Sequence, residues 1–293
     1  MALKSNASLA EVLKSASVFL EERGFDGNLA QSYWLRVFDW TLTDLVRQLH
    51  QAPNREDYET FQVVLERLVT HEPLQYILGY EDFDGHRFKV TPAVLIPRED
   101  TAGILDLAAD WLEKHPNASQ ALDLGTGSGI LAISLALRHP QLQLTAGDLS
   151  SEALAIAKEN GKSLQATVDW LITDICQGLP QDRTYDLVIS NPPYISETEL
   201  DLMDESVKRY EPSMALFAKH EGLAFYRQLA KQIGPYLKPI ACLILEIGFR
   251  QGQAVVDIFR QAFPQAKVSC HQDLNGRDRY VQVEINERKE MTS

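Results

Sequence analysis

Hydrophobic residues up to residue 78 recur every three or four positions, which is the period of an amphipathic helix. The first such segment has its hydrophobic residues at Leu9, Val12, Leu13, Ala16, Phe19 and Leu20. Gly24 follows this segment and predicts the end of a helix. Three further segments are predicted to be helical, at 28–40, 43–51 and 55–71. No strand pattern interrupts them, and we therefore expect residues 1–78 to form a small helical bundle.

The pattern changes at Tyr80. Two short aromatic-rich runs flank Asp84 and Gly85, and this arrangement predicts a β-hairpin. A loop with two prolines, TPAVLIPRED, follows at 91–100, and an apolar helix is predicted to start near Thr101. We interpret residues 79–100 as a hairpin linker and loop between the bundle and a second domain at 101–293.

From about residue 120 onward, strand and helix patterns alternate. The predicted strands are ALDLG (121–125), LQLTAGD (142–148), TVDWLIT (167–173), YDLVIS (185–190) and ACLILEI (241–247). Such alternation predicts a parallel sheet that helices cover on both faces, as in α/β proteins. The end of the chain differs, because 266–273 and 279–285 flank the turn-rich segment LNGRD and predict an antiparallel pair that closes the sheet edge.

Composition and charge narrow the class of protein. The chain of 293 residues is 45% hydrophobic and 24% charged, which is typical of a soluble globular protein. Its net charge is 28 − 41 = −13, which argues against broad adhesion to nucleic acid. Its three cysteines are scattered, which predicts neither disulfides nor a zinc site. The most apolar stretch, IACLILEIG, is too short to cross a bilayer, and the N-terminal sequence resembles an amphipathic helix and not a secretory signal. We expect a cytoplasmic protein.

The segment LDLGTGSGI places three alternating glycines, Gly125, Gly127 and Gly129, between a predicted strand and a predicted helix. One interpretation is a tight turn that binds no ligand. The other is a ligand site, because glycines at this junction let the backbone approach a ligand closely. A dinucleotide site requires G-x-G-x-x-G, and here Ile130 occupies the position of the third glycine. The acid at the end of the next strand, Asp148, suits a ribose diol in either case. The spacing resembles motif I of class I S-adenosylmethionine-dependent methyltransferases, and NAD remains the alternative.

A second motif, VISNPPYI, ends the fourth predicted strand with Asn191, Pro192, Pro193 and Tyr194. Prolines cannot continue a sheet ladder, and an ordinary strand-ending turn is the simpler interpretation. In class I methyltransferases this segment faces the methyl group, and NPPY resembles the signature of enzymes that methylate a nitrogen conjugated to a planar group. Such a nitrogen is a poor nucleophile. The Asn191 oxygen and the Pro192 carbonyl can each accept one of its N–H bonds, and Tyr194 offers a flat face for stacking.

The motif alone does not choose between adenine, cytosine, guanine and glutamine. The rest of the chain resembles the HemK (PrmC) family closely, from the helical bundle to the last strand. The segments that carry this resemblance are EPLQYILGYEDFDGHRF (72–88), VLIPREDT (94–101), DLGTGSG, NPPYI, YEPSMALFAKHEGLAFYRQL (210–229), LEIGFRQG (245–252) and DLNGRDRYV (273–281). The resemblance implies a class I methyltransferase fold in which the domain at 101–293 is catalytic and the bundle helps to bind a protein substrate.

The resemblance also implies a reaction, a cofactor and a partner. The reaction is N5-methylation of the glutamine in the Gly-Gly-Gln loop of class 1 peptide-chain release factors, with S-adenosylmethionine as donor and no metal. We expect a monomer that binds neither nucleic acid nor membrane. The residues that would contact the cofactor are Asp123, Gly125, Thr126, Gly127, Ser128, Gly129, Asp148, Asp174, Ile175 and Asn191. The substrate glutamine would be held by Asn191, Pro192, Pro193, Tyr194 and Arg98, of which Asn191, Pro192 and Tyr194 are the implied catalytic residues.

One loop departs from the family pattern. The usual sequence is I-P-R-P-[ED]-T-E, whereas 96–102 reads IPREDTA, with Glu99 and Ala102 in place of the proline and the final glutamate. Two other functions stay open: a nucleic-acid amino-methyltransferase, which predicts a basic, aromatic-lined face, and a binding module that has lost the chemistry. The segment KRYE at 208–211 is expected to be a solvated helix end.

Overall fold

The computed structural model describes residues 7–196, 200 and 203–286. The chain divides into two compact units. The first contains the residues up to Gly79 together with Asp204–Tyr210, and the second contains Tyr80–Met203 and the residues from Glu211 onward. A short segment from the second half of the chain therefore belongs to the N-terminal unit.

The N-terminal unit is helical. Its helices are α1 (Leu9–Glu21), α2 (Asn28–Val37), α3 (Leu42–Gln48), α4 (Arg55–Leu68), α5 (Leu74–Leu78) and α9 (Glu205–Tyr210). Ser8 caps α1 and Thr41 caps α3, each in a capping box with an acidic residue three positions later. The four predicted helices are confirmed. The sequence pattern did not predict α5, because five residues are too few to show a helical period.

Aromatic side chains pack together in the core of this unit, beside leucine, valine and alanine side chains. Trp34 and Phe61 are buried, and their ring centroids lie 5.5 Å apart. Trp40 stacks on Phe38 at 4.7 Å.

The hydroxyl of Tyr210 on α9 lies 2.8 Å from the Thr70 hydroxyl and donates to the Thr70 carbonyl at 3.2 Å. These contacts tie α9 to the end of α4.

The second unit begins with the predicted hairpin. Strands β1 (Tyr80–Phe83) and β2 (His86–Lys89) pair antiparallel, and Asp84 and Gly85 between them both have positive φ, at 51° and 73°. Two consecutive left-handed residues are the requirement of a type I′ hairpin turn, which Asp-Gly satisfies. The proline-containing loop then leads into the short 3-10 helix η1 (Glu99–Thr101).

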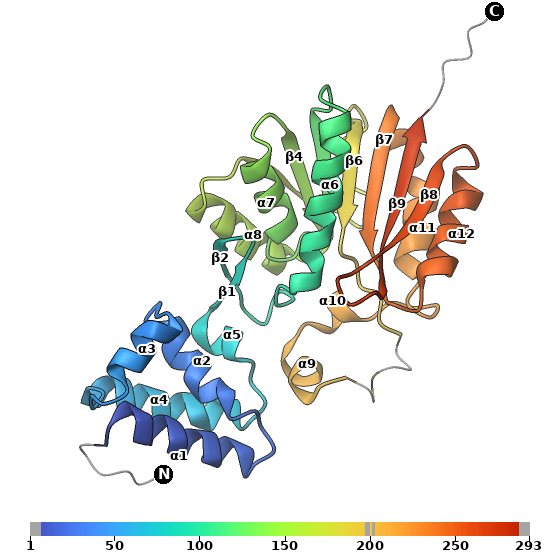
Figure 1. The fold of residues 1–293 in the computed structure, drawn as a ribbon. Coiled ribbons are helices and arrows are strands. Elements are labelled where there is room, and N and C mark those ends of the chain that lie inside the picture. Colours follow the sequence, from blue (N-terminus) through green and yellow to red (C-terminus); the bar gives the residue numbers. More distant parts are fainter. Residues whose placement is uncertain (1–6, 197–199, 201–202, 287–293) are drawn as a thin grey trace, which may run out of the picture. The chain divides into compact units, whose positions relative to one another are not determined.

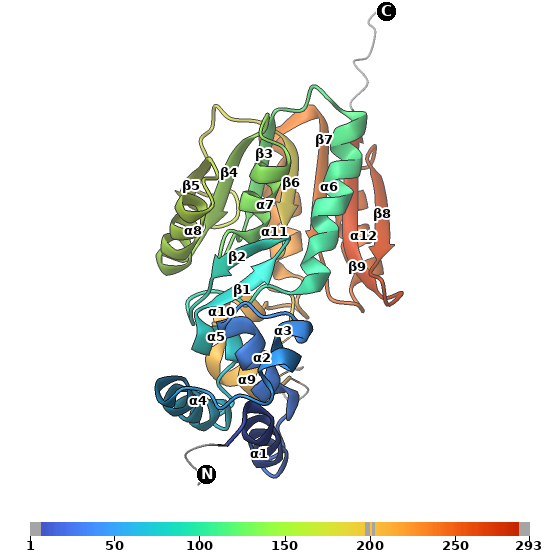
Figure 2. The ribbon, with the colours of Figure 1, turned by 60° about the vertical axis from the view of Figure 1, so that its left-hand side comes forward.

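A seven-stranded sheet forms the centre of this unit (Figures 1 and 2). Its strands are β3 (Gln120–Leu124), β4 (Gln143–Asp148), β5 (Val168–Ile172), β6 (Tyr185–Ser190), β7 (Leu237–Glu246), β8 (Lys267–Gln272) and β9 (Asp278–Asn286). Their order is β5-β4-β3-β6-β7-β9-β8. The predicted strands and the antiparallel β8–β9 pair are confirmed. The last strand in the sequence, β9, is inserted antiparallel between β7 and β8, so β8 is the edge.

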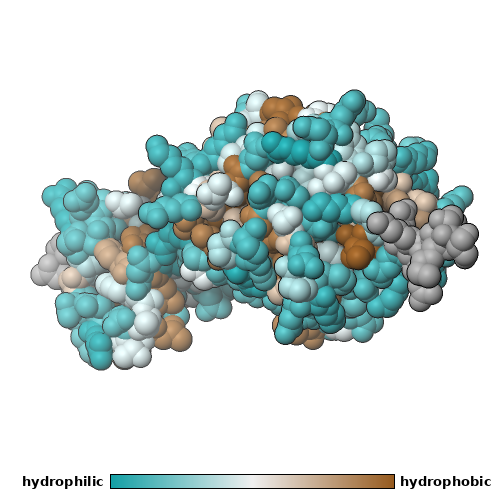
Figure 3. Space-filling model, turned by 90° about the horizontal axis from the view of Figure 1, so that it is seen from above, coloured by the Kyte–Doolittle hydropathy of each residue, from teal (hydrophilic) through white to brown (hydrophobic). Residues whose placement is uncertain are grey.

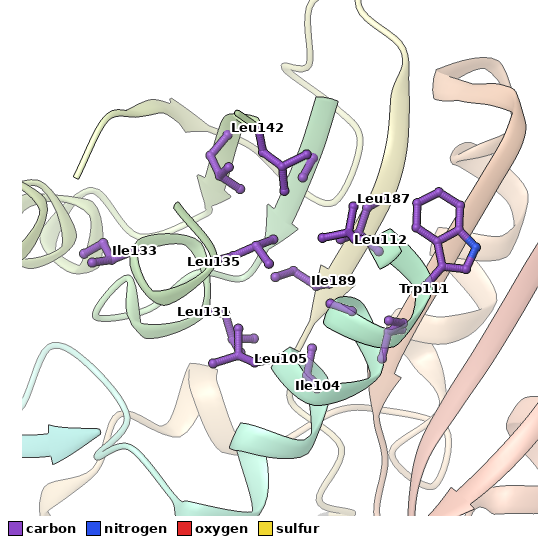
Figure 4. Close-up of a cluster of buried hydrophobic side chains, with 14 of the residues drawn as sticks. Ile104, Leu105, Trp111, Leu112, Leu131, Ile133, Leu135, Leu142, Leu187 and Ile189 are labelled. Carbon is purple, nitrogen blue, oxygen red and sulfur yellow. The ribbon is translucent and has the colours of Figure 1, made fainter. Parts of the chain in front are cut away.

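Helices cover both faces of the sheet, as the strand pattern predicts. They are α6 (Ala102–Lys114), α7 (Ile130–Arg138), α8 (Ser151–Ser163), α11 (Ala224–Gln232) and α12 (Gly252–Ala262). The short elements α10 (Ser213–Leu216) and η3 (Gly234–Tyr236) lie in the segment between β6 and β7. A hydrophobic core lies on each face of the sheet, and successive side chains of β6 point into one or the other. Leu187 and Ile189 pack in the core with α6 and α7, and Val188 packs in the core with α11 and α12. Figure 4 shows the first of these cores, in which Leu105 and Leu131 meet between α6 and α7.

Hydrophilic residues cover most of the face drawn in Figure 3, and hydrophobic residues lie there in small, separate patches. Among the residues that the structure describes, no helix has the length and apolar character needed to cross a membrane.

Candidate active site

Most of the predicted site residues lie where parallel strands end. The glycine loop follows β3, Asp148 ends β4 and Asn191 follows β6, and Glu246, which was not predicted, ends β7. Strand β3 pairs with β4 on one side and with β6 on the other, and these are the strands at which the chain order reverses. Ligands of open α/β sheets bind at this switch point, outside the carboxyl ends of the strands. The strand order therefore places the glycine loop, Asp148 and the NPPY segment at neighbouring strand ends on one edge of the sheet.

A side chain would have different effects at the three glycine positions of the loop. All three have positive φ, at 70° for Gly125, 55° for Gly127 and 86° for Gly129. A Cβ atom on Gly129 would lie 2.9 Å from Cδ1 of Ile133, so the packing of α7 explains this glycine. A Cβ atom on Gly125 or Gly127 would have no described atom within 4 Å apart from its chain neighbours. The backbone at these two positions thus faces open space that a ligand can fill.

Asp148 joins the glycine loop to the end of β4. Its Oδ2 accepts a hydrogen bond from the Gly127 N–H at 2.8 Å, and its Oδ1 accepts one from the Ser150 N–H at 2.9 Å. The Asp148 carbonyl accepts a hydrogen bond from the N–H of Thr173, which follows β5. Asp174, which is exposed, and half-buried Ile175 therefore lie next to the end of β4. The structure brings together predicted cofactor residues from three adjacent strands.

Asp123 is fully buried beneath the loop. Its Oδ2 accepts hydrogen bonds from the Thr126 hydroxyl at 2.6 Å and from the Ala132 N–H at 3.2 Å. Within the described part of the chain, no donor reaches its Oδ1. Burial, the main cause, raises the pKa of Asp123 to about 7. An orphaned carboxyl oxygen and the open space over Gly125 and Gly127 fit a ligand that has a cationic amino group, such as S-adenosylmethionine.

A chain of hydrogen bonds leads inward from Asn191. Its Nδ2 donates to the hydroxyl of Thr101 at 2.9 Å, and this hydroxyl donates to Oε2 of Glu246 at 2.8 Å. The hydroxyl of Tyr194 donates to the other carboxyl oxygen, Oε1, at 3.2 Å. Thr101 and Glu246 are buried, whereas Asn191 and Tyr194 are half-buried. Tyr194 therefore contacts the buried Glu246 carboxyl directly, and Asn191 is connected to it through Thr101.

Hydrogen bonds also fix the backbone of the NPPY segment. The Ser190 hydroxyl donates to the Leu124 carbonyl at 2.6 Å, which joins the end of β6 to the glycine loop. Gln251 donates from Nε2 to the Tyr194 carbonyl at 2.9 Å. Burial raises the pKa of the Tyr194 phenol, and the nearby Glu246 carboxyl raises it further. Tyr194 is thus a hydrogen-bond donor and not a base near neutral pH.

Glu246 and Gln251 were not predicted from the sequence, and Thr101 was not predicted to have a role in the site. A signal existed for Glu246, because it is the single charged residue in the apolar strand segment ACLILEI. A buried charged residue at the end of a parallel strand is unusual enough to suggest function. Thr101 and Gln251 carry no comparable signal.

Arg98 forms an ion pair with Glu211, and this corrects the prediction for KRYE. Lys208 and Arg209 do pair with Glu205 on α9, but the Glu211 side chain is only 1% exposed. One Glu211 oxygen accepts from the Arg98 guanidinium and the other accepts from the Ile96 N–H at 3.2 Å. The pair holds the loop before η1 in place.

We expect Arg98→Ala to lower the free energy of unfolding by about 2 kcal/mol, because it leaves the buried Glu211 carboxylate with one partner fewer. Urea denaturation measures this change. The double variant with Glu211→Gln should recover part of the loss, since it removes the unpaired charge. A loss in the double variant larger than in Arg98→Ala would contradict the assignment.

Two buried carboxyls predict a pH dependence of stability in the protein without cofactor. The pKa values of Asp123 and Glu246 are both raised to about 7, mainly by burial. Between their ordinary values and pH 7 the folded state binds more protons than the unfolded state, so stability falls as pH rises through this window and is flat above it. Each carboxyl should contribute roughly 3 to 4 kcal/mol to this fall. Urea denaturation of the wild type and Glu246→Gln from pH 4 to 8 checks this, because the difference between the two should change only in that window.

Comparisons with known proteins agree with this geometry. Residues 11–79 match a family model described as the PrmC N-terminal domain, and residues 101–209 match one described as the methyltransferase small domain. The chain is 39% identical over 275 residues to the release factor glutamine methyltransferase of Enterococcus faecalis, covering 94% of this chain and 98% of that protein. It is 34% identical over 289 residues to that of Bacillus subtilis, covering 96% and 99%.

The solved structure of a methyltransferase from Pyrococcus furiosus has a TM-score of 0.50 and 14% identity, and the match covers 77% of this chain and 100% of that chain. At this identity the likeness concerns the fold alone. Together with the matched methyltransferase family model, it confirms the predicted methyltransferase fold.

Proposed function

The chain belongs to the release factor glutamine methyltransferase family, and from this premise we propose that its acceptor is the glutamine of the Gly-Gly-Gln loop in class 1 peptide-chain release factors. The enzyme transfers a methyl group from S-adenosylmethionine to the side-chain amide nitrogen of a release factor glutamine. The observation that carries the assignment of the site is that the glycine loop and the NPPY segment follow adjacent parallel strands, β3 and β6.

In this proposal the backbone at Gly125 and Gly127 would lie against the cofactor, because a Cβ atom at either position would enter open space. Asp148, whose carboxylate is already oriented by the Gly127 N–H, accepts from the ribose hydroxyls. Asp123 stabilises the positive amino group from beneath the loop. The other residues assigned to this site are Thr126, Ser128, Gly129, Asp174 and Ile175, with the last two beside the adenine. S-adenosylmethionine supplies a methyl group on a positively charged sulfur, which makes the carbon electrophilic.

The NPPY segment holds the substrate amide. The Asn191 Oδ1 and the Pro192 carbonyl each accept one N–H of the glutamine NH₂, which directs the nitrogen lone pair toward the methyl carbon. Pro193 fixes the backbone that presents this carbonyl, and the Tyr194 ring stacks on the planar amide. As the nitrogen–carbon bond forms and the sulfur–carbon bond breaks, the nitrogen becomes acidic and loses its proton to water. No strong side-chain base is required.

The remaining assignments concern binding of the whole release factor. In this proposal residues 1–78 help to bind the protein substrate, 79–100 is a linker and 101–293 is the catalytic domain. The division of the chain after Gly79 agrees with the first of these boundaries. Arg98 is paired with Glu211, but its side chain is 42% exposed, and this exposed part is free to contact the loop of the release factor.

The direct test incubates the purified enzyme with isotope-labelled S-adenosylmethionine and a class 1 release factor. Mass spectrometry of the digested factor should place one labelled methyl group on the loop glutamine, and none on a factor in which that glutamine is replaced by alanine. A matched reaction with a nucleic acid should remain unlabelled. Label on another residue, or on the nucleic acid, would reject the proposal.

A further inference from the structure

Glu246 is a buried carboxyl that the reaction described above does not use directly. We propose that Glu246 is a positioning residue for methyl transfer, which acts through the Thr101 hydroxyl to hold the Asn191 amide with its nitrogen inward and its oxygen toward the substrate. This inference rests on the proposed role of Asn191. It adds two residues, Thr101 and Glu246, to the three that the NPPY motif supplies.

The hydrogen bonds that connect Asn191 through Thr101 to Glu246 form a relay. Its direction follows from which of these groups can donate and which can only accept a hydrogen bond. An ionised carboxylate only accepts, so the Thr101 hydroxyl donates its single proton to Glu246 Oε2. The Thr101 oxygen then has only acceptor capacity left for its second partner, which must therefore present an N–H. If the Asn191 amide were flipped, two acceptor oxygens would face each other at 2.9 Å. The relay thus turns Oδ1 of Asn191 away from Thr101, where it can accept an N–H from a substrate amide.

The surroundings of Glu246 leave its carboxyl little freedom. On the accessible side, the Tyr194 hydroxyl donates to Oε1, so both carboxyl oxygens are engaged. From α11, the buried Tyr226 hydroxyl donates to the Glu246 backbone carbonyl at 2.7 Å. The remaining charged and titratable groups that act on Glu246 are Arg279, Tyr280 and Asp100. Arg279 favours the ionised form, and its guanidinium also pairs with Asp100 at 3.3 Å.

Protonation of Glu246 would permit the relay to run in the opposite direction. A proton on Oε2 would be donated to the Thr101 oxygen, the Thr101 hydroxyl would then donate outward, and the Asn191 amide would flip to accept it. Asn191 would present N–H groups to a substrate that also presents N–H groups. The kcat at saturating cofactor should therefore fall as pH drops below the pKa of Glu246, which burial raises to about 7. Saturation removes the effect that protonation of Asp123, whose pKa is also raised to about 7, has on cofactor binding.

The test compares three variants of the full-length enzyme with release factor as substrate. Thr101→Val, which removes only the hydroxyl, should lower kcat about tenfold to a hundredfold and leave KM for the release factor and the cofactor Kd unchanged. Thr101→Ser, which keeps the hydroxyl, should restore most of the rate. Glu246→Gln, whose neutral amide can donate to the Thr101 oxygen as a protonated Glu246 would, should lower kcat at every pH to about the wild-type value at low pH, and it should abolish the further loss of rate below pH 7. The double variant Thr101→Val/Glu246→Gln should be no slower than Thr101→Val, since the two residues act in series.

Thermal denaturation and cofactor titration of every variant separate positioning from folding. Losses of Tm and cofactor affinity with an unchanged kcat would overturn the inference. Equal losses of rate in Thr101→Val and Thr101→Ser would also overturn it. So would a kcat of Glu246→Gln that still falls as the pH drops below 7. If the wild type methylated no release factor glutamine, the proposed function would fail. If it did so and Thr101→Val matched it in rate, only the present inference would fail.

Discussion

Asn191→Ala is expected to lower kcat about a hundredfold to a thousandfold, because it removes the acceptor that orients a poorly nucleophilic amide nitrogen. The side chain is half-buried and its Nδ2 is already bound to Thr101, so only Oδ1 is directed to the substrate. Steady-state kinetics with a release factor, together with isothermal titration of the cofactor, measure the effect. The cofactor Kd should stay within about twofold of the wild-type value, since the open glycines lie in the loop after β3.

Asn275→Ala is a matched control for the loss of an asparagine side chain. Asn275 is exposed in the turn between β8 and β9 and should tolerate the change without a loss of rate. Equal losses of kcat and cofactor affinity in Asn191→Ala would contradict the proposed role, because they would indicate general damage to the site.

Gly125→Val is expected to weaken cofactor binding by at least about a hundredfold, which corresponds to about 2.7 kcal/mol. The new side chain would occupy the open space in which we place the cofactor. Isothermal titration with S-adenosylmethionine gives the change in Kd, and kcat at saturating cofactor shows whether the chemistry survives.

Gly276→Val separates this steric effect from backbone strain. Gly276 has φ of 73°, close to the 70° of Gly125, and a Cβ on either would meet no described atom within 4 Å beyond the chain neighbours. Both variants should therefore lose similar stability from the left-handed conformation. Only Gly125→Val should lose cofactor affinity, and a similar loss in Gly276→Val would show that the effect is not local.

The parts of the site that the sequence predicted are those encoded in contiguous segments. The glycine loop and the NPPY segment each carry their chemistry in a few neighbouring residues, and strand alternation brings them to one edge of the sheet. The hairpin at Asp84-Gly85 was predictable for the same reason, since two adjacent residues determine its turn.

The parts that the sequence did not predict depend on long-range packing. Thr101 lies 90 positions from Asn191 and 145 from Glu246, and no local pattern relates these three residues. Glu211 follows a charged helix end, so its neighbours suggested a solvated position, but its carboxyl is buried beside Arg98. The inner position of β9 likewise follows from the pairing of the sheet and not from the pattern of its residues.

A crystal structure of the enzyme with S-adenosylhomocysteine and a glutamine-containing peptide from the release factor loop tests the central claim most directly. We predict that the cofactor product lies over Gly125 and Gly127, with the glutamine amide nitrogen within hydrogen-bonding distance of the Asn191 Oδ1 and the Pro192 carbonyl. A glutamine bound elsewhere, or an NPPY segment turned away from the cofactor, would contradict the account.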